Sequence, residues 1–387
     1  MLDYQNTEYA YAHISTSQLK RERWILRLLQ SKSLVQFGSR MTLQALNLGL
    51  PVENILRTTL FKKFCVGENL EQAIEHCKTM KDLDIDICYH YSIEGSTSEA
   101  LSEQIFKEKM KILSQTKGFA ALKCTGIINP IILRKKQQGL NLTTEEKAKF
   151  EGFKNRLFTL GDRAQASQCA LQIDAEESWI QDIIDDLTFQ MMVQYNKKKP
   201  VIYQTAQMYR HDTLAKLHKW YEESELQNFI LAIKLVRGAY HEKENHFAAQ
   251  HQIESAVHQH KKDTDKDYNN ALKYLMTTPK LTAVFAGTHN EESVTLYTNL
   301  IDQTKHTMAT TSQLYGMADH LTFNCQKQGY PSCKYVPYGP IQKVIPYLIR
   351  RAIENSSIQG EMNRELLMIE TELKRREHDK KNHELAS

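Results

Sequence analysis

The chain has 387 residues, of which 41% are hydrophobic and 25% are charged, as in an ordinary globular protein with a large core. A net charge of +4, with acids and bases interspersed, argues against a nucleic-acid partner. No apolar stretch approaches the roughly 20 residues that a membrane-spanning helix needs.

The cysteines and the N-terminus bear on the cellular compartment. Seven cysteines without CxxC or zinc-ligand spacing predict free thiols in a reducing environment. Residues 1–13 lack the features of a secretory or organellar signal. We therefore expect a cytoplasmic protein, with peripheral contact at the inner face of a membrane as an alternative. The histidines and acids do not fall at HExxH or facial-triad spacing, so no metal site is predicted.

The first 80 residues are predicted to form a helical arm that precedes the main domain. Their apolar residues recur at helical spacing, both before Pro51 and after it. The residues that share a face in these two stretches are Ile25, Leu28 and Leu29, and then Val52, Ile55, Leu56 and Leu60.

From residue 81 to about 360, short β-branched or aromatic runs alternate with amphipathic helical patterns. Strict alternation implies parallel strands joined by crossover helices, and eight such units close a (β/α)8 barrel of typical size. An open doubly wound sheet is the structural alternative. The chain has neither GxGxxG nor GxxxxGK, the Gly-rich phosphate loops of open sheets, which favours the barrel. The expected strands are 83–93, 118–127, 168–174, 201–209, 231–240, 281–287, 308–315 and 334–339.

Several helices are indicated by capping-box pairs and by 3.6-residue apolar periods. Residues 361–387 are expected to begin as an amphipathic helix on the barrel and to end in a charged tail, of which the final dozen residues are disordered. The capping pairs are Ser96 with Glu99 and Thr143 with Glu146, and the periods cover residues 180–191, 268–275 and 314–321.

Residues 334–355 carry the most informative pattern. A short strand is followed by a turn at Gly339 and Pro340, and then by a helix with a proline at or near its first turn. At roughly 100° per residue, one arc of this helix holds polar groups and the opposite face is aliphatic. Two adjacent arginines suit bidentate binding of a carboxylate or phosphate, although a solvated surface face would show the same spacing. The polar arc consists of Tyr347, Arg350, Arg351 and Glu354.

Polar residues at the carboxyl ends of the predicted strands are the candidates for chemistry, because (β/α)8 enzymes react at that face. Lys123 and Lys234 stand out, since charges inside apolar runs are unfavourable unless they are paired or functional. Structural roles are open too: Lys123 and Asp174 could form a buried ion pair. Lys123, Lys234 and Arg237, together with the Arg350–Arg351 pair, predict a cationic pocket for a small anionic ligand. The candidates are Lys123, Asp174, Glu176, Gln207, Lys234, Arg237, Thr288, His289 and Tyr335.

Four motifs then resemble one known family. In their order at the strand ends they are similar to the proline dehydrogenases, and the likeness covers nearly the whole chain. The resemblance implies a barrel that binds noncovalent FAD and oxidises L-proline to Δ1-pyrroline-5-carboxylate by hydride transfer. It also implies reoxidation by a quinone, and a pyrroline-5-carboxylate dehydrogenase that could dock to receive the product. The motifs are DAEES from Asp174, KLVRGAY from Lys234, THN from Thr288, and KYVPYG followed by PYLIRRAIEN from Lys334.

The family's functional residues carry over to matching positions of this chain. Asp174 and Lys234 match its acidic residue of strand 3 and its basic residue of strand 5 and are the predicted catalytic residues, with lysine at 234 where several members have arginine. The positions matched to substrate binding are Lys123, Leu314, Tyr335, Tyr347, Arg350, Arg351 and Glu354, and those matched to flavin contact are Ala175, Gln207, Arg237, Gly238, Ala239, Thr288 and His289.

Two positions depart from the family pattern: Val66 stands where glycine is usual, and His90 where aspartate is usual. Three other functions are compatible with the sequence. A hydroxyproline dehydrogenase would use the same pocket. A lyase or aldolase would use Lys123 as a Schiff-base nucleophile. A catalytically silent membrane scaffold would use the segment after Glu361 and the basic run at residues 373–376.

Overall fold

A computed structural model describes residues 3–48, 52–93, 98–278, 282–357 and 359–386, with side chains for all of these except 32, 43, 46, 47, 354–357, 359–362 and 383–386. Eight strands close into a barrel in chain order, and the strand pairs from β1 to β7 are parallel. The predicted (β/α)8 barrel is confirmed. Seven strands lie within their predicted ranges, and β8 begins two residues earlier. The strands are β1 (Asp86–Tyr91), β2 (Gly118–Leu122), β3 (Cys169–Ile173), β4 (Ile202–Gln207), β5 (Ala232–Val236), β6 (Ala283–Gly287), β7 (Ala309–Leu314) and β8 (Ser332–Tyr338).

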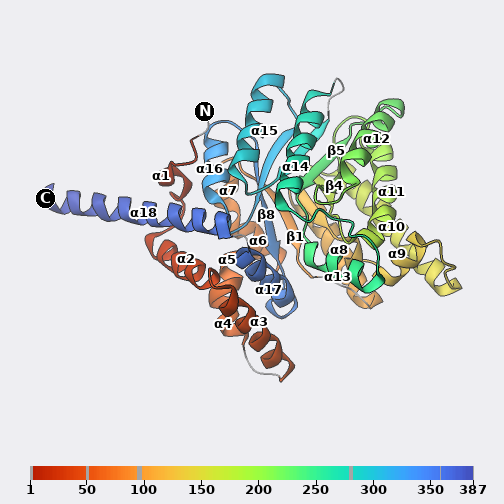
Figure 1. Cartoon of the computed structure of the whole chain (residues 1–387). Helices are drawn as coiled ribbons and strands as arrows, with labels where there is room; N and C mark the ends of the chain where they lie inside the picture. Colours follow the sequence, from red (N-terminus) through yellow and green to blue (C-terminus); the bar gives the residue numbers. More distant parts are fainter. Residues whose placement is uncertain (1–2, 49–51, 94–97, 279–281, 358, 387) are drawn as a thin grey trace. The chain divides into compact units, whose positions relative to one another are not determined.

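Helices follow the strands, and Figure 1 shows α11 and α12 against β4 and α14 beside β5. The capping box predicted at the start of α10 is present, because Glu146 N donates to Thr143 Oγ1 (3.2 Å) and Thr143 N donates to Glu146 Oε2 (2.9 Å). The helices after the strands are α8 (Glu99–Gln115), η2 (Cys124–Gly126), α9 (Pro130–Gln137), α10 (Thr144–Ala166), α11 (Ser178–Tyr195), α12 (Thr213–Leu226), α13 (His241–His251), α14 (Lys261–Thr277), α15 (Glu291–Thr304), α16 (Asp319–Lys327) and α17 (Ile341–Ser357).

Aromatic rings fill part of the barrel interior. Phe119 of β2, Tyr203 of β4 and Phe285 of β6 have ring centroids 4.9 to 6.4 Å apart. Because these strands are not neighbours, the three rings must point inward, as in the layered packing of such barrels. Lys234 pairs in register with Thr205 on one side and with Phe285 on the other. The side chain of Lys234 therefore also points into the barrel.

The chain forms two compact units. The first contains Cys88–Thr288 and Glu292–Ser312, and the second contains Met1–Ile87, His289–Glu291 and Gln313–Ser387. The helical character predicted for residues 1–80 is present in the second unit, while a domain boundary at residue 80 stays a prediction. Besides α16 and α17, the helices of the second unit are α1 (Thr7–Ala10), α2 (Thr16–Leu29), α3 (Lys32–Asn47), α4 (Glu53–Leu56), the π-helix η1 (Arg57–Phe61), α5 (Lys62–Phe64), α6 (Leu70–His76), α7 (Lys78–Asp82) and α18 (Gln359–Ala386).

One hydrophobic cluster holds the second unit together. It joins α1, α2, α3 and α5 to α17 and α18, and α18 lies alongside α2 (Figure 1). Leu19 of α2, Leu348 of α17 and Ile369 of α18 are fully buried in it. Burying each such side chain contributes roughly 1.5–3 kcal/mol. The apolar face predicted for the C-terminal helix is therefore a packing face within this unit.

Two helix starts differ from prediction. Helix α8 is capped by Ser98, whose hydroxyl accepts a hydrogen bond from Leu101 N (3.3 Å), and Ser96 lies outside the described residues. The helix predicted over 314–321 is wrong in its first turn, because β7 runs to Leu314 and α16 begins only at Asp319. Gly316 and Ala318 have φ angles of +75° and +51°, which no right-handed helix accepts.

Two further expectations near the C-terminus are corrected. The tail expected to be disordered is helical, since α18 extends to Ala386. Arg376 donates from its guanidinium to the backbone oxygens of Tyr11 (2.8 Å) and Ile14 (2.9 Å), which ties this helix to the N-terminal segment. Pro346 lies inside α17 rather than in its first turn, because that helix already begins at Ile341.

Two sequence expectations about the compartment can be compared with the structure. All seven cysteines are free, as predicted, and all are buried. Among the described residues, no helix is both long enough and apolar enough to cross a membrane.

Candidate active site

A buried ion pair lies inside the barrel. Lys234 Nζ is 2.6 Å from Asp174 Oδ1, and the two residues are only 5% and 7% exposed. The backbone N–H of Asp174 donates to Leu122 O (2.8 Å), which fixes the start of the loop after β3. Each buried charge is tolerated because the other compensates it. The two residues predicted to be catalytic are therefore in direct contact.

Lys123 follows β2 and is half-buried. Its ammonium donates to the hydroxyl of Tyr240 (3.3 Å) and lies 5.7 Å from the centre of the same ring. Tyr240 is a site residue that the sequence analysis did not single out. The available signal was its place at the end of KLVRGAY, four residues after the end of β5 and directly after a turn that contains Arg237 and Gly238.

Glu176 is a buried acid in the loop after β3. Its carboxylate accepts hydrogen bonds from the backbone N–H of Thr125 (2.9 Å) and from the Thr125 hydroxyl. Burial raises the pKa of Glu176 to about 7, and the nearby positive charge of Lys123 opposes that rise. The loop therefore carries a carboxyl group that changes charge near neutral pH.

Gln207, at the end of β4, joins two loops through its side-chain amide. Its Nε2 donates to Glu176 O (2.8 Å), and its Oε1 accepts from the backbone N–H of Ala239 (3.2 Å). The Gln207 carbonyl in turn accepts from Thr213 Oγ1 (2.9 Å). The loops after β3 and β5 are thus held at fixed positions by one buried side chain.

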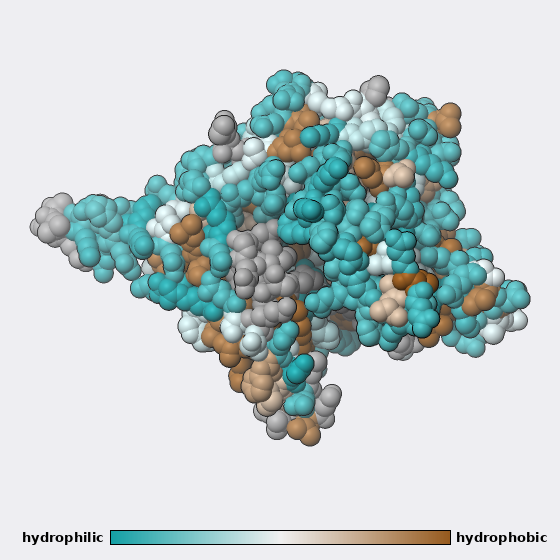
Figure 2. Space-filling view, in the orientation of Figure 1, coloured by the Kyte–Doolittle hydropathy of each residue, from teal (hydrophilic) through white to brown (hydrophobic). Residues whose placement is uncertain are grey.

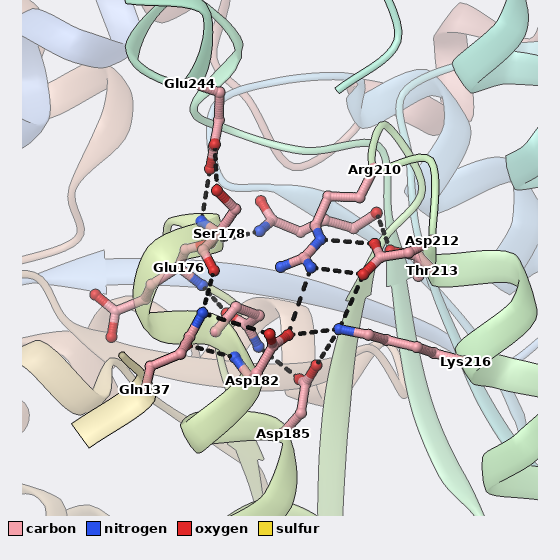
Figure 3. A network of polar contacts seen from close by, with 12 residues as sticks. Gln137, Glu176, Ser178, Asp182, Asp185, Arg210, Asp212, Thr213, Lys216 and Glu244 are labelled. Atoms are coloured by element: carbon pink, nitrogen blue, oxygen red, sulfur yellow. Dashed lines mark hydrogen bonds and ion pairs between the residues drawn. The ribbon is translucent and has the colours of Figure 1, made fainter. Parts of the chain in front are cut away.

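A larger polar network holds the start of α11 (Figure 3). Glu244 accepts from the backbone N–H of Ser178 (2.7 Å) and from its hydroxyl (2.6 Å). Asp182 forms an ion pair with Lys216 (2.6 Å), and Arg210 forms one with Asp212 (2.7 Å). Since α11 begins directly after the loop that carries Asp174, Ala175 and Glu176, this network makes the loop rigid from outside the barrel.

The loop after β5 carries three of the residues matched to flavin contact. Arg237 binds Asp265 (2.5 Å) and Ser293 (2.9 Å), donates to the hydroxyl of Thr288, and lies 4.5 Å from the ring of Tyr268. Gly238 has a φ of +137°, in the region that favours glycine. Gly238 and Ala239 are exposed, whereas Ala175, Gln207 and Thr288 are buried.

This set of residues has the chemistry to hold a flavin dinucleotide. An arginine, backbone groups beside an exposed glycine, and a buried amide are the groups that bind a pyrophosphate and a polar ring edge. On the inner face of β3 and β4, Gln172 Nε2 and Thr205 Oγ1 are buried without a hydrogen-bond partner among the described residues. Buried polar atoms of this kind normally have partners, so they too fit a polar ligand.

The remaining matched residues belong to the second unit. The imidazole Nε2 of His289 accepts from the backbone N–H of Leu314 (3.1 Å), and Tyr315 N donates to Tyr335 O (2.9 Å). On α17, Tyr347 is buried, and the guanidinium of Arg351 lies 5.4 Å from its ring centre. Arg350 and Arg351 are both half-buried, so neither lies on a fully solvated face. The side chain of Glu354 is outside the described residues.

The two departures from the family pattern are both buried. Val66 is 6% exposed, and its backbone N–H donates to Pro337 O (3.1 Å) at the end of β8. His90 lies on β1 and is 2% exposed. Among the described residues there is no cluster of three or more histidines, cysteines or acids that could hold a metal ion.

Comparison with known protein families identifies the family of this chain. The sequence model of the proline dehydrogenase family matches residues 73–364, which include all eight strands and every charged residue of the candidate site. The chain belongs to the proline dehydrogenase family.

Several curated proteins are similar over most of the chain. Proline dehydrogenase 1 (mitochondrial) of Dictyostelium discoideum is 30% identical over 96% of this chain and 74% of its own length. The carbapenem antibiotics biosynthesis protein CarD of Pectobacterium carotovorum is 29% identical over 80% of this chain and 82% of its own length. Proline dehydrogenase 2 (mitochondrial) of Arabidopsis thaliana is 36% identical over 61% of this chain and 51% of its own length.

Solved structures of proline utilization A (PutA) share the fold of this proline dehydrogenase family member. PutA from Bdellovibrio bacteriovorus, inactivated by N-propargylglycine, superposes with a TM-score of 0.70 at 18% identity. The match covers 87% of this chain and 36% of that PutA chain, so this protein spans about a third of the PutA length.

Proposed function

We propose that this protein is an oxidoreductase that converts L-proline to Δ1-pyrroline-5-carboxylate with noncovalent FAD, the first step of proline degradation to glutamate. The observation that carries the proposal is the family match over residues 73–364, with the family's charged motif residues within or after barrel strands.

The reaction removes a hydride from the ring carbon next to nitrogen, while the nitrogen lone pair forms the C=N bond. Bound FAD supplies the two-electron acceptor for that hydride. The substrate ammonium must first lose a proton, which we assign to solvent. The protein's own contribution is to hold the ring carbon in position and to exclude water.

Three cations are assigned to the substrate carboxylate. Arg350 and Arg351 offer planar guanidiniums suited to bidentate binding, and Lys123 adds a point charge held by Tyr240. Glu354 is assigned to the substrate site as well, as the counterpart of the acid that follows the arginine pair in the family. Leu314, Tyr335 and Tyr347 are assigned to the walls that enclose the pyrrolidine ring.

Asp174 and Lys234 are assigned to the reacting end of the site, as the family's acidic residue of strand 3 and basic residue of strand 5. Their 2.6 Å contact places an acidic and a basic side chain together in the barrel interior. The flavin is assigned to Ala175, Gln207, Arg237, Gly238, Ala239, Thr288 and His289. Because Gln207 joins two of these loops, it supports the cofactor position as well as contacting the cofactor.

A quinone is the electron acceptor that we propose for the reduced flavin, and contact with a membrane surface would give access to it. A pyrroline-5-carboxylate dehydrogenase is the proposed consumer of the product and a docking partner. The cytoplasm is the proposed compartment. Among other activities, hydroxyproline oxidation is the nearest, because the same tyrosines and cations would bind that substrate.

The first test is an anaerobic visible spectrum of the purified protein before and after addition of L-proline. We expect a flavin band that bleaches, with FAD released on denaturation. A colourless protein that releases no flavin would falsify the proposal. A flavin that stays oxidised with L-proline but bleaches with hydroxyproline would show that hydroxyproline is the substrate instead. Borohydride trapping of an adduct on Lys123 in the absence of flavin would instead support the lyase.

A further inference from the structure

Exposed hydrophobic side chains are concentrated in one part of the second unit. Of the twelve large hydrophobic residues that are exposed in the described parts of the chain, seven lie between residues 24 and 55. Figure 2 shows hydrophobic surface gathered over α3 and α4. The seven are Trp24 (54% exposed), Leu28 (43%), Leu34 (57%), Phe37 (65%), Met41 (49%), Leu48 (76%) and Ile55 (68%).

On α3 the exposed residues form one stripe. At 100° per residue, Leu34, Phe37 and Met41 fall within an arc of roughly 60°. Val35 is 8% exposed and points roughly 130° away from the centre of that arc, into the hydrophobic cluster. Helix α3 therefore has one apolar face that packs and a second apolar face that meets solvent. On the neighbouring α2, Trp24 and Leu28 are one turn apart and are likewise exposed.

Positive charge surrounds these side chains. Residues 16–48 contain six basic residues and one acid, against a net charge of only +4 for the whole chain. The acid, Glu22, forms an ion pair with Lys63 at 2.8 Å. Lys20 and Arg27 are exposed on the same side of α2 as Trp24, and Arg40 is exposed beside the stripe of α3. Among these basic residues whose side chains the structure describes, Arg27 alone forms an ion pair with an acid, Glu370 at 2.6 Å.

We propose that the α2–α3 surface (Trp24, Leu28, Leu34, Phe37 and Met41) is a membrane-binding site that lies on an anionic lipid surface. Aromatic and aliphatic side chains surrounded by Lys and Arg are the pattern of helices that lie in the plane of the interface. The apolar residues enter the headgroup region, while the basic residues bind anionic headgroups. This proposal does not depend on proline oxidation.

A second copy of the chain fits this surface less well than lipid does. A twofold contact would place two copies of the same basic surface against each other, and like charges disfavour such pairing. The basic run near the C-terminus is also less suited to lipid. Arg375 and Arg376 there bind Glu372 (2.9 and 2.7 Å), and Leu373 is buried. Lys20 and Arg40, which have no acidic partner among the described side chains, are the charges that remain available to lipid headgroups.

The experiment is co-sedimentation of the full-length protein with vesicles of phosphatidylcholine alone and with 30% phosphatidylglycerol. We expect binding to the anionic vesicles that weakens as salt increases. The variant F37S/M41S should bind at least tenfold more weakly, because both side chains are exposed and enter the lipid. The variant K20Q/R40Q should lose roughly tenfold or more on anionic vesicles only.

Matched controls separate this site from general stickiness. L226S/I253S removes two other exposed hydrophobic residues, which are 80% and 56% exposed, and should bind as the unaltered protein does. K147Q/K219Q makes the same charge change elsewhere and should have much less effect than K20Q/R40Q. Melting temperatures of all variants establish that each is folded. Absence of binding to anionic vesicles, or equal loss in L226S/I253S, overturns the proposal. A dimer that F37S/M41S dissociates, without vesicle binding, would make the surface a contact between copies.

Discussion

Lys234 on β5 and Asp174 after β3 form their 2.6 Å ion pair across the intervening strand β4. Removing either partner alone leaves an uncompensated buried charge, so D174N or K234M should each lower the free energy of unfolding by about 3–5 kcal/mol. The double variant K234M/D174N should lose less than the sum of the two. Urea unfolding of the full-length protein measures all three. K149M, which breaks the exposed 2.6 Å pair with Glu145, should change stability by at most about 1 kcal/mol.

Gly238 lies directly against the ring of Tyr209. A Cβ atom at Gly238 would come within 2.4 Å of that ring, and the φ of +137° is itself unfavourable for alanine. We expect G238A to lower the free energy of unfolding by more than about 1–3 kcal/mol and to reduce the flavin bound per protein. Gly139 provides the control, because its φ is +68° and a Cβ there has no neighbour within 4 Å. If G238A and G139A have equal stability and flavin content, the contact with Tyr209 has no role.

Glu176 should make stability depend on pH. Its pKa is about 7 in the folded protein and about 4.5 when unfolded, so between these values the folded state holds more protons. The free energy of unfolding should therefore fall as pH rises from 4.5 to 7. E176Q lacks this titration, and its stability relative to the unaltered protein should improve by roughly 2–3 kcal/mol across that window. Parallel urea titrations at pH 5 and pH 8 test this; a constant difference between the two proteins would contradict it.

Arg351 is proposed to bind the substrate carboxylate. R351Q should lower kcat/KM for L-proline tenfold or more, mainly through KM, because charge-assisted hydrogen bonds contribute about 1.5–3 kcal/mol each. R351K keeps the charge but loses the planar guanidinium, so it should recover only part of the loss. Arg163 on α10 donates to Ser114 Oγ (2.7 Å), and R163Q should leave kcat/KM unchanged. An unchanged KM in R351Q would remove Arg351 from the substrate site.

The sequence was sufficient to predict the barrel and to select candidate site residues along its strands, whose roles stay predictions. The alternation of β-branched runs with amphipathic segments determines the order of strands and helices, and charges inside such runs identify Lys123 and Lys234. It could not predict that Lys234 pairs with Asp174 across β4, because that contact depends on barrel closure and on the direction of each side chain. Tyr240 was missed for a similar reason, since a single aromatic residue after a strand has many structural roles.

Contacts between distant segments explain the remaining errors. The C-terminal tail looked disordered from its charge, yet Arg376 binds backbone oxygens more than 360 positions away. The interruption before α16 depends on the left-handed backbone of Ala318, a residue type with no preference for that conformation. Lys109 was overlooked because a lysine on an amphipathic helix normally faces water.

Lys109 of α8 is 1% exposed, and its amine has no hydrogen-bond partner among the described residues. Burial lowers the pKa of Lys109 to about 8, although the negative charge of Asp174 acts in the opposite direction. Between pH 8 and about 10.5 the unfolded chain therefore holds more protons than the folded one. The free energy of unfolding should rise with pH across this window, and the destabilising effect of the charged amine is fully present below pH 8.

Replacing Lys109 by methionine keeps the shape of the side chain and removes the buried charge. K109M should be more stable than the unaltered protein by on the order of 3 kcal/mol at pH 7, and this advantage should shrink as pH approaches 10.5. Guanidinium unfolding of both proteins at pH 7, 8.5 and 10 gives the difference directly. K107M is the matched control, because Lys107 lies on the same helix with a 72% exposed side chain and should change stability by at most about 0.5 kcal/mol. If K109M is less stable than the unaltered protein at pH 7, the Lys109 amine has a partner that stabilises its charge, with Asp174 as the first candidate.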